Sequence, residues 1–73
     1  MDNLTFANTK PGSQFVVIIT KQRYFFQRLV EEKPFKDGLP CGDCGKTTWN
    51  AKNEFGTIVH FCPHTKIESI VRW

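Results

Sequence analysis

The most regular hydrophobic pattern in the chain is a run of β-branched and aromatic residues in its first third. Residues 15–20 read Phe-Val-Val-Ile-Ile-Thr and come after a turn-forming Pro-Gly pair, which is typical of a β-strand. The apolar residues are consecutive and do not alternate with polar ones. We therefore expect this strand to be buried on both faces or to lie centrally in a small sheet.

The next segment, residues 21–32, admits two interpretations. As a helix it would begin at a Thr20 cap and gather its apolar residues into one stripe. As a strand it would place Tyr24 and Phe26 on one face, which Arg28 interrupts. The aromatic content and the neighbouring strand favour a second strand that pairs with the first.

A second hairpin is predicted after the connector formed by residues 33–40, in which Asp37-Gly38 marks a turn. Residues 46–51 and 57–61 are expected to be its strands. The loop between them, residues 52–56, carries Asn and Gly, which tolerate the left-handed backbone conformation that such loops need.

The C-terminal segment, residues 65–73, also leaves two structures open. Thr65 followed three residues later by Glu68 is a helix-capping pattern, whereas Ile67 and Val71 would share one face of a strand. The predicted fold class is a small, mostly-β (α+β) single domain with an antiparallel sheet, in which this segment alone could add a short helix.

The N-terminal residues 1–13 are predicted to form a flexible arm, and residues 14–73 a single compact domain. Turn and coil formers dominate the arm. Two interpretations stay open: a loosely docked terminus, or an arm that becomes ordered on a partner through Leu4, Phe6 and Lys10.

Length and cysteine count narrow the class of protein. A chain of 73 residues forms one domain and buries only about 60% of its unfolded surface, so a metal or a cross-link would add stability. Three cysteines cannot all pair. This odd number argues against a secreted disulfide framework and for thiols that are free or metal-bound in a reducing compartment.

Two clusters carry the residues that could bind a metal. Cys41 and Cys44 form a Cys-x-x-Cys turn, and His60, Cys62 and His64 stand at alternate positions beyond a predicted hairpin. Zn²⁺ prefers four tetrahedral ligands of this kind. The predicted set is Cys41, Cys44, Cys62 and His64, because Pro63 should end the strand there; His60 is the reserve ligand.

This arrangement resembles the zinc-ribbon family, in which two turns at the tips of β-hairpins hold one zinc. The resemblance covers residues 39–66; Cys41, Cys44 and Gly45 match the family's first turn, while Cys62-Pro63-His64 departs from its second. It implies a zinc-ribbon-like hairpin and a structural zinc. Partners in the family are DNA, RNA or proteins.

Other uses of these residues fit the sequence less well. A redox Cys-x-x-Cys should open a helix in a βαβ unit, and so short a chain has little room for the cleft of a cysteine nucleophile. Unliganded buried thiols remain an alternative. A catalytic zinc needs a general base, for which Glu54 is the nearby carboxylate. We expect a protein that is not an enzyme and has no small-molecule substrate.

The net charge of +3 is local, since residues 10–30 contain four basic residues and no acid. Basic side chains next to aromatic ones can contact phosphates while the rings stack on bases, although a solvated surface over a core is the simpler interpretation. With the arm, the predicted partner-binding residues are Leu4, Phe6, Lys10, Lys21, Arg23, Tyr24 and Arg28.

The total length, the arm over residues 1–14 and the basic segment beyond it also resemble the small regulators of lytic phages such as those of Xanthomonas. The resemblance implies binding to a subunit of host RNA polymerase, inhibition of initiation and antitermination. The alternative is a ribbon that binds DNA or RNA directly. We expect a cytoplasmic protein (bacterial host cytoplasm, if phage-encoded) without a membrane segment, because the longest apolar run has five residues, 15–19.

Overall fold

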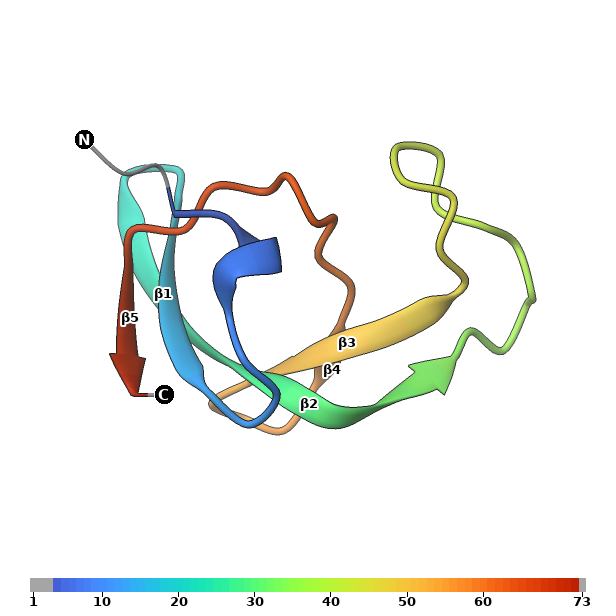
Figure 1. Cartoon of the computed structure of the whole chain (residues 1–73), viewed down its shortest axis with the longest axis horizontal. Coiled ribbons are helices and arrows are strands. Elements are labelled where there is room, and N and C mark those ends of the chain that lie inside the picture. Colours follow the sequence, from blue (N-terminus) through green and yellow to red (C-terminus); the bar gives the residue numbers. More distant parts are fainter. Residues whose placement is uncertain (1–3, 73) are drawn as a thin grey trace.

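The computed structural model describes residues 4–72 as one antiparallel sheet with a single turn of 3-10 helix (Figure 1). Its elements are η1 (Phe6–Asn8), β1 (Gln14–Ile19), β2 (Gln22–Pro34), β3 (Thr48–Asn53), β4 (Ile58–Val59) and β5 (Ser69–Arg72). The strand order is β4-β3-β2-β1-β5. The predicted small, mostly-β domain is confirmed, and the first strand lies inside the sheet, paired with β2 on one side and with the edge strand β5 on the other. No helix within residues 4–72 is long and apolar enough to cross a membrane.

The first two strands form a tight hairpin in which Phe15 lies opposite Phe26 and Val16 opposite Phe25. A strand sends neighbouring side chains to opposite faces, so Phe26 is buried while the ring of Phe25 is half exposed. A helix would have placed both rings in one stripe. The preference for a strand over residues 21–32 is confirmed.

The long strand β2 connects the two ends of the molecule. Its first half pairs with β1, and its second half pairs with β3, with a register shift between Arg28 and Lys33. The shift bends the strand away from the core. Figure 1 shows β2 crossing the lower side of the molecule toward the loop that follows it.

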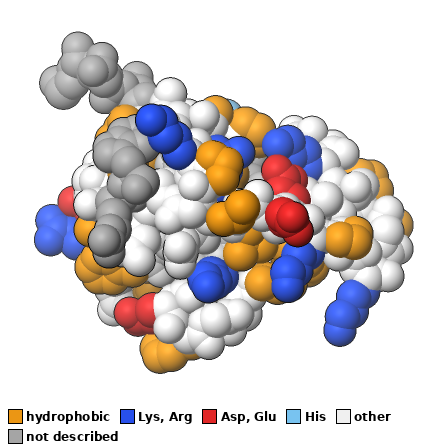
Figure 2. Space-filling model, turned by 60° about the horizontal axis from the view of Figure 1, so that its bottom comes forward, with side chains coloured by type: hydrophobic (Ala, Val, Ile, Leu, Met, Phe, Trp, Pro, Cys, Tyr) orange, Lys and Arg blue, Asp and Glu red, His pale blue; other side chains and the backbone are white. Residues whose placement is uncertain are grey.

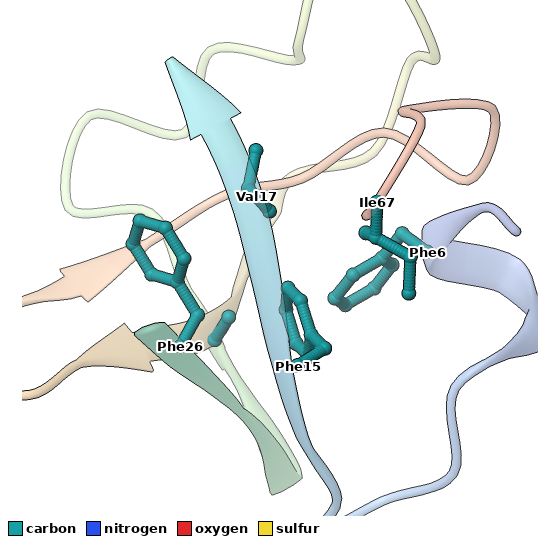
Figure 3. Close-up of a cluster of buried hydrophobic side chains, with 6 residues drawn as sticks. Phe6, Phe15, Val17, Phe26 and Ile67 are labelled. Atoms are coloured by element: carbon teal, nitrogen blue, oxygen red, sulfur yellow. The ribbon is translucent and has the colours of Figure 1, made fainter. Parts of the chain in front are cut away.

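The core is an aromatic cluster on one face of this sheet. The rings of Phe6, Phe15, Phe26 and Phe61 form five stacked or edge-to-face pairs, with centroids 4.8 to 6.1 Å apart. Such geometries suit the charge distribution of aromatic rings. Figure 3 shows Phe6 on one side of Phe15 and Phe26 on the other. Aliphatic side chains of Val17, Ala51 and Ile67 complete the cluster.

The expected N-terminal arm is packed onto the domain over its described part. Phe6 is 1% exposed, and its backbone N–H donates to the carbonyl of Thr65 at 2.9 Å. Thr5 forms a β-bridge with Lys66. The described part of the arm therefore contacts the domain through Thr5 and the buried Phe6. Residues 1–3 lie outside the described part, and the flexibility of the arm stays a prediction.

The C-terminal segment is a strand, which corrects the alternative of a short helix. Ile70 of β5 lies opposite Phe15 and packs against the core. The outer edge of β1 would otherwise leave its backbone N–H and C=O groups unpaired. Glu68 does not cap a helix: its carboxylate forms a 3.1 Å ion pair with Arg23.

Candidate metal centre

Four side chains from two distant segments converge at the end of the molecule opposite β5. Cys41 and Cys44 come from the loop after β2, and His60 and Cys62 follow β4. Their ligand atoms all lie within 4.8 Å of one another. The individual separations are 3.6 Å between the sulfurs of Cys41 and Cys62, and 3.2 Å from Cys44 Sγ to His60 Nε2.

These separations have the size of a tetrahedral metal site. With metal–sulfur bonds of about 2.3 Å and metal–nitrogen bonds of about 2.0 Å, ligand atoms at tetrahedral angles lie about 3.5 to 3.8 Å apart. The observed 3.2 and 3.6 Å, together with 3.9 Å from Cys62 Sγ to His60 Nε2, bracket that range. These three separations therefore match a tetrahedral site to within a few tenths of an ångström, and the cluster as a whole could hold a metal ion.

The ring of His60 is oriented for ligation. Its Nδ1 lies 2.8 Å from the carbonyl oxygen of Thr48. A carbonyl can only accept a hydrogen bond, so Nδ1 carries the proton and Nε2 is left with a free lone pair toward the thiols. This outer hydrogen bond is the usual support of a metal-bound histidine. The ring of Phe35 packs edge-to-face on the imidazole at 5.6 Å.

The Cys41–Cys44 turn is held by its own backbone. The N–H of Cys41 donates to Lys46 at 2.8 Å, and the N–H of Gly45 donates to Cys41 at 2.9 Å. Gly45 has φ +75°, a left-handed conformation that glycine adopts without strain. Backbone N–H groups of Cys44 and Asp43 lower the pKa of the Cys41 thiol to about 6, which favours the thiolate that a metal requires.

Cys62 occupies the opposite kind of environment. It is buried, and burial raises the pKa of its thiol to about 12, with the neighbouring Cys41 and Cys44 adding to the effect. Sulfurs this close cannot all become thiolates without a compensating positive charge. A divalent cation would supply that charge, and ligation would take the place of the Cys62 proton.

Asn50 is a positioning residue that the sequence analysis missed. Its side chain is fully buried; the amide Nδ2 donates to the carbonyl of Phe61 at 2.7 Å, and Oδ1 accepts from the N–H of Phe61 at 2.8 Å. Phe61 stands between His60 and Cys62, so this pair of bonds fixes both ligands relative to β3. The sequence carries no signal that sets Asn50 apart, because β3 reads Thr-Trp-Asn-Ala-Lys-Asn and has other polar residues.

The structure brings together Cys41, Cys44 and Cys62 as predicted, but with His60 and not His64. His64 is exposed and lies outside the group. The reason is a turn after Cys62, closed by the N–H of Thr65 donating to the Cys62 carbonyl at 3.0 Å. His60, the reserve candidate, therefore lies in the group with the three cysteines, and the turn after Cys62 places His64 outside it.

The predicted partner-binding residues are dispersed. Leu4 packs against the core and Phe6 lies within it, so the latter is closed to a partner. The Arg28 guanidinium turns inward: it lies over the Phe6 ring, 4.7 Å from the centroid, and donates to the carbonyl of Thr9. Arg28 thus supports the N-terminal segment.

The other members of the set remain on the surface. Lys10 and Lys21 are exposed, Arg23 forms its ion pair with Glu68, and the Tyr24 hydroxyl donates to the Gln22 side chain at 2.8 Å. The basic segment is therefore not one continuous binding stripe, because two of its guanidinium groups already have partners.

Comparisons of the chain with protein-family models, with curated proteins and with solved structures found no match. What the structure has in common with the resemblances drawn from the sequence is the cluster of Cys41, Cys44, His60 and Cys62, which could bind a metal ion.

Proposed function

We propose that the cluster binds zinc as a structural metal. Three thiolates and one imidazole are the donors that zinc prefers, and four protein ligands complete its tetrahedron. A closed site leaves no position for a substrate or an activated water. The observation that carries this proposal is the hydrogen bond from His60 Nδ1 to Thr48, which presents Nε2 to the three sulfurs.

The two histidines provide a matched test of the zinc site. His60→Ala should abolish stoichiometric zinc in the purified protein, whereas His64→Ala should retain it, because His64 lies outside the cluster. Metal analysis by mass spectrometry and competition with a chelating dye measure both. A wild-type protein without zinc after growth in zinc-supplemented medium, or equal loss in the two variants, would contradict the proposal.

We propose that the protein is a small regulatory module, phage-encoded, that binds bacterial RNA polymerase and modulates transcription by inhibiting initiation and promoting antitermination. The supporting observation is a group of exposed large apolar side chains, led by Ile18 and Phe25, on a sheet that a metal can brace at its far end. Exposed apolar residues that cluster are typical of protein interfaces.

Direct binding to nucleic acid is the second candidate function. A surface hollow of about 400 Å³ is lined by residues that include Gln14, Phe25, Gln27, Lys52 and Glu54. A base could stack there beside a phosphate contact. Two facts weigh against it: Arg28 is engaged in the interior, and Arg23 is paired with Glu68.

One set of measurements separates the two functions. Biolayer interferometry with immobilised protein should detect purified bacterial RNA polymerase, and run-off and terminator read-through assays should show fewer starts and more read-through. Titration with single-stranded RNA and duplex DNA should show no salt-sensitive binding, which direct contact with phosphates would produce. Nucleic-acid binding without polymerase binding would reverse the order of the two proposals.

A further inference from the structure

The hairpin between β1 and β2 exposes an unusual amount of apolar surface. We call residues 18–25 the hairpin tip. Within it, Ile18 is 47% exposed, Ile19 44%, Tyr24 40% and Phe25 50%. The register places Ile18 and Phe25 on one face, and Ile19 and Tyr24 on the other. Large apolar groups thus project from both sides of the same ribbon.

The turn of the hairpin tip is strained. Thr20 and Lys21 have φ values of +53° and +64°, both in the left-handed region. A two-residue hairpin turn of this kind strongly favours Asn-Gly, and a β-branched residue such as Thr rarely adopts it. A sequence selected for stability alone would place other residues here, and strain of this kind gathers at functional sites.

The charge of the hairpin tip has one sign. Lys21 and Arg23 are its two charged residues, and the chain has no acid between residues 10 and 30. Within residues 4–72, Lys21 has no hydrogen-bond or ion-pair partner, and the Arg23 side chain is 71% exposed and pairs with Glu68 through Nε alone. On the face seen in Figure 2, which is the lower side of the molecule in Figure 1, hydrophobic side chains lie among both basic and acidic side chains.

We propose that the hairpin tip is a docking element for an acidic, apolar segment of a protein partner. Ile18 and Phe25 would be buried in the contact, and Lys21 with the outer nitrogens of Arg23 would meet carboxylates. A nucleic-acid strand could stack on the rings of Tyr24 and Phe25, but it would leave the aliphatic Ile18 and Ile19 without an apolar partner. An apolar peptide segment matches more of the exposed surface. The naming of RNA polymerase as the partner rests on the proposed function; the chemistry of the segment does not.

The first experiment tests that chemistry with defined probes. Isotope-labelled protein is titrated with a short peptide that alternates glutamate and leucine, with the matched lysine–leucine peptide, and with single-stranded RNA. Amide shifts confined to the hairpin tip with the glutamate peptide alone are expected. An absence of shifts with that peptide, equal shifts with the lysine peptide, tip shifts with RNA, or a concentration-dependent dimer formed through the tip would each overturn the assignment.

The second experiment uses purified bacterial RNA polymerase with Ile18→Ser and Phe25→Ser. Both side chains are about half exposed, so these variants should fold. Val30→Ser and Phe55→Ser are matched controls, because Val30 and Phe55 are more exposed and lie outside the hairpin tip. Polymerase affinity should fall at least about tenfold in the tip variants and stay within about twofold in the controls.

The two experiments fail independently. Peptide shifts at the hairpin tip without any polymerase binding by the wild-type protein would leave the docking assignment and remove the proposed partner. Polymerase binding that survives both tip variants, together with no peptide shifts, would overturn the docking assignment and leave the proposed function.

Discussion

The two ends of the molecule are ordered by different physical means. At the β5 end, four phenylalanine rings pack between β1, β2, η1 and the segment after β4. At the other end, residues 36–40 are all exposed, and Trp49, Phe35 and His60 are only partly buried. What this end offers is four ligand atoms, one buried amide and a few backbone hydrogen bonds.

The comparison shows how a small chain can order a segment that its hydrophobic core does not contact. Burial of apolar area stabilises only the parts that can be packed, and a domain of this size has little interior. A metal ion held by the four side chains would order a loop that has no interior of its own. The first end should therefore control global stability, and the second should control the order of the loop and the affinity for metal.

The largest expected effect comes from opening the aromatic core. Phe15→Ala removes a fully buried ring and should cost about 3 to 5 kcal/mol, which is a large part of the stability of a small domain. Urea unfolding measures it. Phe55→Ala is the control: its ring is 84% exposed, so the change should stay within about 0.5 kcal/mol. Equal losses would place the core elsewhere.

The second effect concerns the metal end alone. Cys44→Ser should lower metal affinity by more than about 100-fold, because losing a ligand costs more than losing an outer-shell partner. Hydrogen exchange should then accelerate at Cys41 and Gly45, whose N–H groups hold the ligand turn. Amides of the β1–β2 hairpin should stay protected from exchange. Wild-type protein treated with a chelator should show the same exchange pattern as Cys44→Ser. Global unfolding in either case would break the comparison.

Asn50→Ala tests the link between the two ends. The change leaves the backbone N–H and C=O of Phe61 without their side-chain partners. It should lower the free energy of unfolding by about 1 to 3 kcal/mol and the metal affinity by about 10- to 100-fold. Asn53→Ala is the control on the same strand, since Asn53 Oδ1 accepts from Phe55 and Thr57 at the β3–β4 turn. The control should lose stability without losing metal affinity. Equal metal affinity in the two variants would remove the positioning role of Asn50.

The smallest expected effect is a gain. Thr20→Asn combined with Lys21→Gly fits the left-handed turn and should add about 1 kcal/mol, visible as a rise of about 4 to 8 °C in Tm. Thr20→Ala alone should give no such gain, because alanine is still strained at positive φ. A double variant that is no more stable than the wild type would show that the turn carries no strain.

Local patterns in the sequence were sufficient to predict the central strands and the three thiol ligands. The run from Phe15 to Ile19 and the Cys-x-x-Cys spacing are both short-range signals. The strand was confirmed, and the three thiols lie together in a cluster that could hold a metal ion. Choosing a strand for residues 21–32 already needed the neighbouring strand as context, because the spacing of their apolar residues slightly favours a helical stripe.

Other features depend on contacts between distant residues and could not be predicted from local pattern. The N-terminal segment is held by the β-bridge between Thr5 and Lys66 and by the hydrogen bond from Arg28 to Thr9. No residue pattern near Phe6 predicts these two contacts. The choice between His60 and His64 depends on where the strand ends and the turn begins. The ends of elements are uncertain by one or two residues, and each histidine is only two positions from Cys62.

The bridge between Thr5 and Lys66 has a consequence for how the chain folds. Phe6 can enter the core only when the segment before β5 has arrived, and β5 itself must pair with β1. Sheets built from such distant pairings fold in milliseconds to seconds, while local hairpins form in microseconds. The β1–β2 hairpin should therefore appear early with its aromatic rings uncovered, and the rate at which the two ends of the chain meet should limit closure of the core.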